Sequence, residues 1–368
     1  MATPPSPQDA WTHPGVQRVS LAAASEAFPR HSEPTFIERR DGTLLVAWQE
    51  FLGSAHRAED TAPSRIALME SHDEGRSWHS HRVIVETEPG DVNVYSPNFF
   101  RVGGTIFLLV MTYHQLEGGK PLVSSLRRYR SRDEGQTFEA DGWVWQRESY
   151  QIASGVARVL PSGRILLPFV RQCGVMWGPG DHLDASCFYS DDGGESWQRI
   201  GQWLKLPMRG AMEPHVAAAG PGRVAMVMRN QLGSVFAAFS GDDGLIWSLP
   251  QTTGLSAPES CPELVNDPRT GDLILIWNHA PYDPGFTSHF GKRTPLSLAR
   301  SHDGGRTWEK VADLRNEPEG CYSNPVAFVT SRGRWIVAYF YTHYLVNGRM
   351  DVSGISLQAV VFDADFWQ

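Results

Sequence analysis

The stretch SHDGGRTW, residues 301–308, decides the fold, because the chain carries four more copies of its S-x-D-x-G-x-x-[WF] pattern. The copies are SHDEGRSW (71–78), SRDEGQTF (131–138), SDDGGESW (190–197) and SGDDGLIW (240–247), and successive copies begin 50 to 61 residues apart. Such a period is too long for a short solenoid and is typical of propeller blades. In each copy we expect the aspartate to accept bonds from nearby backbone N–H groups, so that the pattern forms a tight turn.

A second repeat consists of two apolar strands joined by a turn that contains glycine. It occurs six times, starting at Glu33, Tyr95, Ala153, Met212, Glu259 and Tyr322. Five copies are followed by a third strand, an aspartate turn and a fourth strand, whereas the sixth is followed only by the strand at residues 354–362. Residues 15–22 then have to supply the missing outer strand. The sequence therefore predicts an all-β fold, a six-bladed β-propeller with four-stranded antiparallel blades, closed by an N-terminal strand that joins the last blade.

The composition of the chain restricts its size class and its partners. The repeats leave no room for a linker, so we expect a single propeller domain over residues 1–368, with residues 1–14 as a flexible N-terminal extension. The formal net charge is −8 and no basic cluster is present, which argues against nucleic acid and favours a carbohydrate or small-molecule ligand. No segment approaches 18 uninterrupted apolar residues, so we expect no contact with a membrane.

Cysteine spacing and the N-terminus add two expectations. The four cysteines, Cys173, Cys187, Cys261 and Cys321, have no C-x-x-C spacing, so neither a zinc site nor a disulfide framework is indicated, and we expect no cofactor. The N-terminus lacks the basic and apolar regions of a signal peptide. This predicts a cytoplasmic protein, or a secreted one if a signal was removed. The sequence gives no indication of the oligomeric state.

The order of strands within a blade predicts where a ligand binds. Because strands alternate in direction, the starts of the first strands and the ends of the second strands lie on one face of the propeller. The aspartate turns lie on the opposite face, where we expect them to be scaffold. The ligand face collects polar residues from every blade, among them Glu33, Arg171, His215, Glu259 and Asn278. Converging polar groups of this kind are typical of a binding site.

With its aspartate boxes, the chain resembles the sialidase superfamily of six-bladed propellers. In MEPHVAAAGPGRVAMVMR (212–229), the spacing of Glu213 and Arg229 is similar to that of a family glutamate and arginine. KRTPLSLARS (292–301) is similar to the segment of the third family arginine, here Arg293, and GCYSNPVAF (320–328) to the motif of the nucleophilic tyrosine, here Tyr322. RAEDTAPSRIALMES (57–71) holds the loop of the family's acid/base aspartate and offers Asp60, with Glu59 beside it.

The resemblance implies a role for each of these residues. Tyr322 would attack the sugar, with Glu213 as the base that takes its proton, as in the sialidase exception to the two-carboxylate mechanism. Asp60 or Glu59 would protonate the leaving oxygen. Arg229 and Arg293 would hold an anionic group of the substrate.

One motif departs from the family pattern. The first family arginine opens the first inner strand, where this chain reads HSEP (31–34), so that Ser32 stands in its place and Glu33 follows. Arg57 or Arg171 could substitute for that arginine from elsewhere. A lost cation beside an added carboxylate predicts weak cleavage of sialosides and a preference for a sugar whose hydroxyl groups donate to Glu33.

These residues predict an exo-acting, sialidase-like glycoside hydrolase that cleaves a terminal acidic or polar sugar with retention, through a tyrosine nucleophile. Two alternatives remain open. A polysaccharide lyase acting on a uronate would use Tyr322, His215 and Arg229. A propeller that binds carbohydrate without catalysis is the other, because the fold alone does not imply activity.

Overall fold

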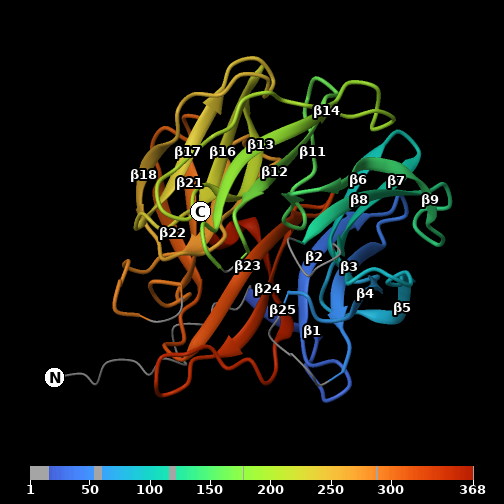
Figure 1. Ribbon diagram of the computed structural model, residues 1–368, viewed down its shortest axis with the longest axis horizontal. Helices are drawn as coiled ribbons and strands as arrows, with labels where there is room; N and C mark the ends of the chain where they lie inside the picture. Colours follow the sequence, from blue (N-terminus) through green and yellow to red (C-terminus); the bar gives the residue numbers. More distant parts are fainter. Residues whose placement is uncertain (1–15, 54–59, 116–121, 177, 287–288, 368) are drawn as a thin grey trace.

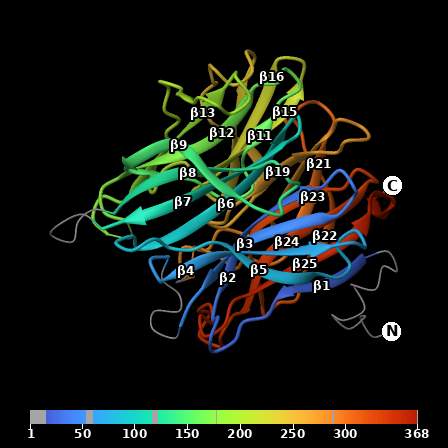
Figure 2. The same ribbon diagram turned by 90° about the vertical axis from the view of Figure 1, so that its right-hand side faces the viewer.

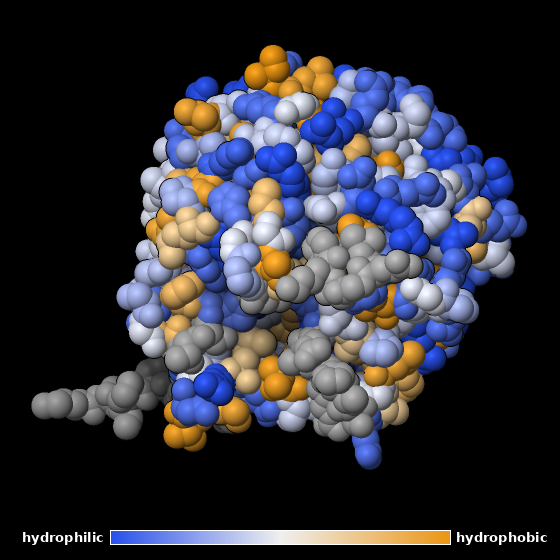
Figure 3. All heavy atoms as spheres, in the orientation of Figure 1, coloured by the Kyte–Doolittle hydropathy of each residue, from blue (hydrophilic) through white to orange (hydrophobic). Residues whose placement is uncertain are grey.

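The computed structural model describes residues 16–53, 60–115, 122–176, 178–286 and 289–367. Over these residues the chain is a six-bladed β-propeller with almost no helix, as the repeats predicted. The blades follow one another in chain order around a central axis (Figure 1). Each blade is an antiparallel sheet whose first strand lies innermost. On the face shown in Figure 3, hydrophilic side chains predominate and apolar ones occur in small groups.

The first three blades account for residues 31–199. Blade 1 contains β2 (His31–Glu38), β3 (Leu44–Phe51), β4 (Ser64–Ser71) and β5 (His79–Val85). Blade 2 contains β6 (Asn93–Val102), β7 (Thr105–His114), β8 (Val123–Ser131) and β9 (Glu139–Glu148). Blade 3 contains β10 (Tyr150–Gln151), β11 (Arg158–Val159), β12 (Ile165–Cys173), β13 (His182–Ser190) and β14 (Gln198–Arg199). Its inner strand is interrupted, because β10 and β11 both pair with β12.

The remaining blades complete the ring. Blade 4 contains β15 (Met212–Gly220), β16 (Arg223–Arg229), β17 (Ser234–Ser240) and β18 (Gln251–Ser256). Blade 5 contains β19 (Glu263–Asn266), β20 (Leu273–Asn278), β21 (Leu296–Ser301) and β22 (Glu309–Arg315). Blade 6 contains β23 (Gly320–Val329), β24 (Arg334–His343), β25 (Ser356–Asp363) and β1 (Val16–Ala22), and a short 3₁₀ helix, η2 (Ala364–Trp367), follows β25.

The ring closes as the sequence predicted. β1 pairs antiparallel with β25, so the two ends of the chain share one sheet, and Figure 2 shows them side by side. This pairing joins the first described strand to the last blade and gives blade 6 the four strands that most of the other blades have.

The aspartate boxes are turns that bind their own backbone and pack on the preceding blade. In the last box Asp303 accepts bonds from the Ser301 hydroxyl (2.8 Å) and from the backbone N–H of Thr307 (2.9 Å), and the bonds to Thr307 hold its pKa at about 2. A Cβ placed on Gly75 in the first box would lie 2.5 Å from Ile336 of blade 6. Glycine is therefore required there for contact between blades as well as for its positive φ of 85°.

Apolar side chains fill the space between neighbouring blades. One cluster joins Phe100 and Phe107 of blade 2 to Ile165 and Phe169 of blade 3. Within the described part of the chain, no helix has the length and apolar character needed to cross a lipid bilayer. The four cysteines are all free thiols.

Candidate active site

Four inner strands share one backbone irregularity that points a side chain at the axis. In β2, β6, β15 and β23 a bulge adds one residue relative to the second strand, directly around an X-Pro pair. The residues before the prolines have left-handed backbone conformations, with φ of 54° for Glu33, 46° for Ser96, 41° for Glu213 and 44° for Asn324. Left-handed residues other than glycine are strained and collect at functional sites. All four line one cavity of about 850 Å³, the axial pocket.

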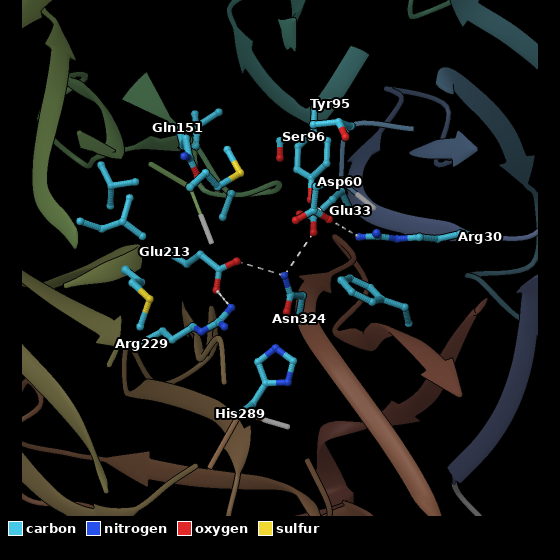
Figure 4. Close-up of a pocket in the computed structure, with 18 of the residues that line it drawn as sticks. Arg30, Glu33, Asp60, Tyr95, Ser96, Gln151, Glu213, Arg229, His289 and Asn324 are labelled. Atoms are coloured by element: carbon cyan, nitrogen blue, oxygen red, sulfur yellow. Dashed lines mark hydrogen bonds and ion pairs between the residues drawn. The ribbon is translucent and has the colours of Figure 1, made fainter. Parts of the chain in front are cut away.

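The floor of the axial pocket holds two carboxylates joined by one amide. The side-chain nitrogen of Asn324 donates to Oε1 of Glu33 (3.1 Å) and to Oε1 of Glu213 (3.4 Å), as the dashed lines in Figure 4 show. The Ser154 hydroxyl donates to the other oxygen of Glu33 (3.0 Å). The distance between the two carboxylate oxygens that bind this amide therefore cannot exceed the sum of the two hydrogen-bond lengths.

The two carboxylates differ in charge state because their partners differ. Burial raises the pKa of Glu33 from 4.5 to about 7, and the negative charge of Glu213 adds to this shift. Burial also acts on Glu213, but its ion pair with Arg229 (2.8 Å) outweighs that effect and lowers the pKa. Near neutral pH the pocket thus holds one carboxyl group that can carry a proton and one that is ionised.

Arg229 is fixed by carboxylates on two sides. Its guanidinium binds Glu213 through one nitrogen and Glu259 through the other (2.7 Å). Glu259 also binds Arg209 (2.7 Å) and Gln231 (2.8 Å). Burial alone would raise the pKa of Glu259, but Arg229 and the other two partners lower it to about 2. Glu259 is buried and does not line the pocket, so it positions Arg229 from behind.

A second ion pair, which the sequence did not predict, lies on the opposite side of Glu33. Arg30 contacts Asp60 (2.9 Å), and the Tyr95 hydroxyl donates to the same oxygen (3.3 Å). Arg30, Asp60 and Tyr95 all line the pocket (Figure 4). Among the described residues, Arg30, Arg229 and Arg293 are the arginines that both line the pocket and are buried.

Arg293 lines the pocket, and within the described part of the chain no carboxylate pairs with its guanidinium. Its two terminal nitrogens donate to the Ser323 hydroxyl (2.9 Å) and to the backbone carbonyl of Glu259 (3.2 Å). Its Nε and the hydroxyl of Ser96 have no hydrogen-bond partner within the described ranges. His289 faces the centre of the pocket from blade 5 (Figure 4). Burial and the neighbouring Arg293 and Arg229 lower the pKa of His289, so its ring is neutral.

The sequence matches the BNR repeat-like domain family over residues 42–337. The chain belongs to this family. No curated protein matches the sequence significantly. Among the described residues of this BNR repeat-like domain, no three His, Cys, Asp or Glu side chains gather as metal ligands.

Solved structures share the whole fold of this BNR repeat-like domain at low identity. A protein of unknown function from Dyadobacter fermentans DSM 18053 has a TM-score of 0.71 at 16% identity, over 95% of this chain and 99% of its own. The NanB sialidase from Streptococcus pneumoniae has 0.72 at 12%, over 95% and 70%. Trypanosoma rangeli sialidase, in complex with the inhibitor DANA, has 0.69 at 14%, over 95% of this chain and 60% of the sialidase. These likenesses show the fold alone, and the domain is a sialidase-like propeller.

Tyr322 lies outside the pocket of this BNR repeat-like domain, which corrects the expected site. Its side chain is fully buried between Tyr339 and Tyr341, and its hydroxyl donates to Glu317. Arg315 also binds Glu317 (2.9 Å) and lies over the Tyr322 ring. This position does not fit a nucleophile, which would have to reach the sugar from the pocket wall. Asn324, two residues later, is the blade 6 residue that contacts Glu213.

Other predicted contacts are also absent from the pocket lining. His215 is buried against Glu263 (3.1 Å) and Cys261 (3.4 Å), and Asn278 donates to the backbone carbonyl of Tyr322 (3.0 Å). Arg171 is held by Asp184 (2.6 Å) and is absent from the pocket lining. Glu59 and Arg57 lie outside the described residues. The lyase residues Tyr322, His215 and Arg229 are therefore not assembled in one place.

Arg30, Ser96, Asn324 and His289 were missed. Aligning the prolines of the inner strands would have found Ser96 and Asn324, because each directly precedes a proline as Glu33 and Glu213 do. Arg30 lies three residues before Glu33 and could have been found from the same alignment. His289 comes from a loop with no repeat pattern. Glu213, Asp60, Glu33, Arg229 and Arg293 do line the pocket.

Proposed function

We propose that this chain is an exo-acting, retaining glycoside hydrolase in which Glu213 is the nucleophile and Glu33 the general acid/base. The observation that carries the proposal is the amide of Asn324 bound to both carboxylates, one with a raised and one with a lowered pKa. Two carboxyl groups whose pKa values are pushed apart are the usual mark of an acid and a nucleophile. The proposal replaces Tyr322 as the nucleophile.

In the first step, an ionised Oε of Glu213 forms a bond to the anomeric carbon while the bond from that carbon to the glycosidic oxygen breaks. Glu33 gives its proton to the departing oxygen, and the alcohol leaves. In the second step, Glu33 removes a proton from water as the water oxygen attacks the same carbon, and Glu213 leaves as a carboxylate. The two inversions give net retention.

The spacing of the carboxylates supports retention over inversion. Retaining enzymes hold the two groups about 5–5.5 Å apart, whereas inverting enzymes leave about 6.5–9.5 Å for a water molecule. In this pocket the bridging bonds of 3.1 and 3.4 Å limit the distance between the two oxygens. The largest oxygen–oxygen distance that these two bonds allow lies only at the lower end of the range of carboxylate separations for inverting enzymes.

The remaining polar groups suit a terminal acidic or otherwise polar sugar. Arg293 offers a buried cation whose two acceptors are uncharged, and Ser96 offers a buried hydroxyl with no partner in the described residues. The sialidases of similar structure are only 12–16% identical to this chain, so they support the fold and do not identify the sugar.

The test combines a substrate screen with chemical trapping. Aryl glycosides of sialic acids, uronic acids, arabinose and rhamnose would be assayed, with the anomer of the first product read by NMR. A fluorinated analogue of the best substrate should then label Glu213, located by peptide mass spectrometry. Glu213→Ala should recover turnover with azide and give a glycosyl azide of inverted configuration. A label on another residue, or a hydrolysis product of inverted configuration, would overturn the mechanism. Binding of a sugar without turnover would instead favour a propeller that binds carbohydrate and has no catalytic activity.

A further inference from the structure

Part of the solvent-exposed mouth of the axial pocket is apolar. Four partly exposed apolar side chains line the mouth, which we call the apolar collar: Leu122, Met176, Met350 and Val352. They come from three loops, between β7 and β8, between β12 and β13, and between β24 and β25. Blades 3 and 6 lie opposite each other in the ring, so Met176 faces the Met350 and Val352 side across the opening.

The pocket is larger than one sugar ring requires. Its volume of about 850 Å³ lies near the upper end of the range of about 300–1,000 Å³ for pockets that hold drug-sized ligands. The buried polar groups that can recognise a sugar, Glu33, Ser96 and Arg293, are all on the floor. A terminal sugar on these groups places its glycosidic bond toward the collar, so the leaving group lies among apolar side chains.

The β24–β25 side of the collar is held in place before any ligand binds. Tyr344 pairs with Met350 across the loop, and Leu345 donates its backbone N–H to Arg349 (2.8 Å). The Tyr344 hydroxyl accepts the backbone N–H of Arg293 (2.7 Å), and its ring packs edge-on against Phe286. These contacts connect the β24–β25 loop to Arg293 in the pocket, so less conformational entropy is lost when a ligand binds to the loop.

The collar suits an aromatic group better than a second sugar. Aliphatic side chains cannot hydrogen-bond the hydroxyl groups of a sugar and a thioether sulfur accepts only weakly, and burying those hydroxyl groups unpaired is costly. Methionine adapts its shape and makes favourable sulfur contacts with aromatic rings. Arg349, beside Met350, is exposed and also lines the pocket, so its guanidinium can stack on an aromatic face.

We propose that the apolar collar binds the aromatic leaving group of the substrate, so that the natural substrate is a glycosylated phenol. This inference rests on the proposed function for its chemistry, but the aromatic site itself does not depend on turnover. In the reaction, the glycosidic oxygen on the aromatic ring accepts the proton of Glu33 as its bond to the anomeric carbon breaks, and a neutral phenol leaves.

The experiment measures binding and turnover separately. The probe is 4-nitrophenol, titrated by ligand-observed NMR into Glu213→Gln protein and into the same protein carrying Met350→Gln and Val352→Asn. Apolar area lost from two collar residues should weaken binding about five- to tenfold. The control is Val346→Asn, on the same loop and fully exposed but absent from the pocket lining, which should bind as the parent does. With active protein, the collar variant should lose the same factor in kcat/KM for a phenyl glycoside and keep its value for the methyl glycoside.

Each outcome separates the two proposals. Absent binding of 4-nitrophenol, or binding unchanged by the collar variant, would overturn the aromatic site even if glycosides are hydrolysed. The aromatic site would also be overturned if a disaccharide were hydrolysed faster than the phenyl glycoside and if the collar variant slowed hydrolysis of that disaccharide. The mouth of the pocket would then bind a second sugar. Collar-dependent binding without turnover of any glycoside would support the aromatic site and refute the hydrolase.

Discussion

The side-chain nitrogen of Asn324 lies 3.4 Å from Oε1 of Glu213, and each residue occupies a left-handed backbone step directly before a proline. These two backbone conformations bring side chains of blade 4 and blade 6 to one point on the axis. An amide is not a nucleophile, so chemistry at this point falls to the carboxylates that Asn324 holds.

Glu33→Gln should lower kcat by about 10²–10⁴ for substrates with poor leaving groups, because no proton reaches the glycosidic oxygen. In the wild type, activity should fall as pH rises through about 7, where Glu33 loses its proton. That alkaline limb should be absent in the variant. A pH–rate profile with the same alkaline limb in both proteins would exclude Glu33 as the acid.

Removing the charge of Arg229 should move the acidic limb of the pH–rate profile to higher pH. Burial raises the pKa of Glu213, and Arg229 lowers it more than Arg293 does, so Arg229→Gln removes the main opposition to burial and Glu213 accepts a proton at a higher pH. Arg229→Lys keeps the charge and should restore much of the original limb. The measurement is kcat/KM from pH 4 to 8, and an unmoved limb in Arg229→Gln would show that Glu213 is not the ionised group.

Tyr322→Phe separates a structural tyrosine from a catalytic one. The hydroxyl donates to Glu317, an anionic acceptor, so its loss should destabilise the fold by about 1.5–3 kcal/mol in urea unfolding. The ring remains packed, and kcat should stay within about twofold of the wild-type value. A fall in kcat of about 10² or more, in folded protein, would return the tyrosine to the mechanism.

Asp303→Ala should destabilise the propeller by about 1–2 kcal/mol, because the turn loses its side-chain acceptor for Ser301 and Thr307. Since Asp303 is absent from the pocket lining, kcat of the folded variant should be unchanged. Thermal unfolding with an activity assay at low temperature measures both. An unaltered Tm would mean that the box is not needed for stability.

The sequence by itself determined the architecture, because its signals are local. Each aspartate box binds its own backbone within a few residues, and alternating apolar strands repeat at a fixed period, so five boxes and six hairpins predicted the six blades. Residues 15–22 were predicted as the closing strand by counting, and β1 confirms this. Glu213, Arg229, Arg293, Asp60 and Glu33, which the sequence offered as site residues, line the axial pocket, and their roles stay predictions.

Only the tertiary structure decided which side chains meet in the pocket and with what charge. Side chains alternate between the two faces of a strand, so one extra residue in a bulge reverses which of them point inward. In β23 the bulge around Pro325 directs Asn324 to the axis and leaves Tyr322 in the core, and in β2 it directs Glu33 there. The pKa of Glu33 depends on burial and on Glu213 from another blade, and no local pattern in the sequence carries information about contacts between blades.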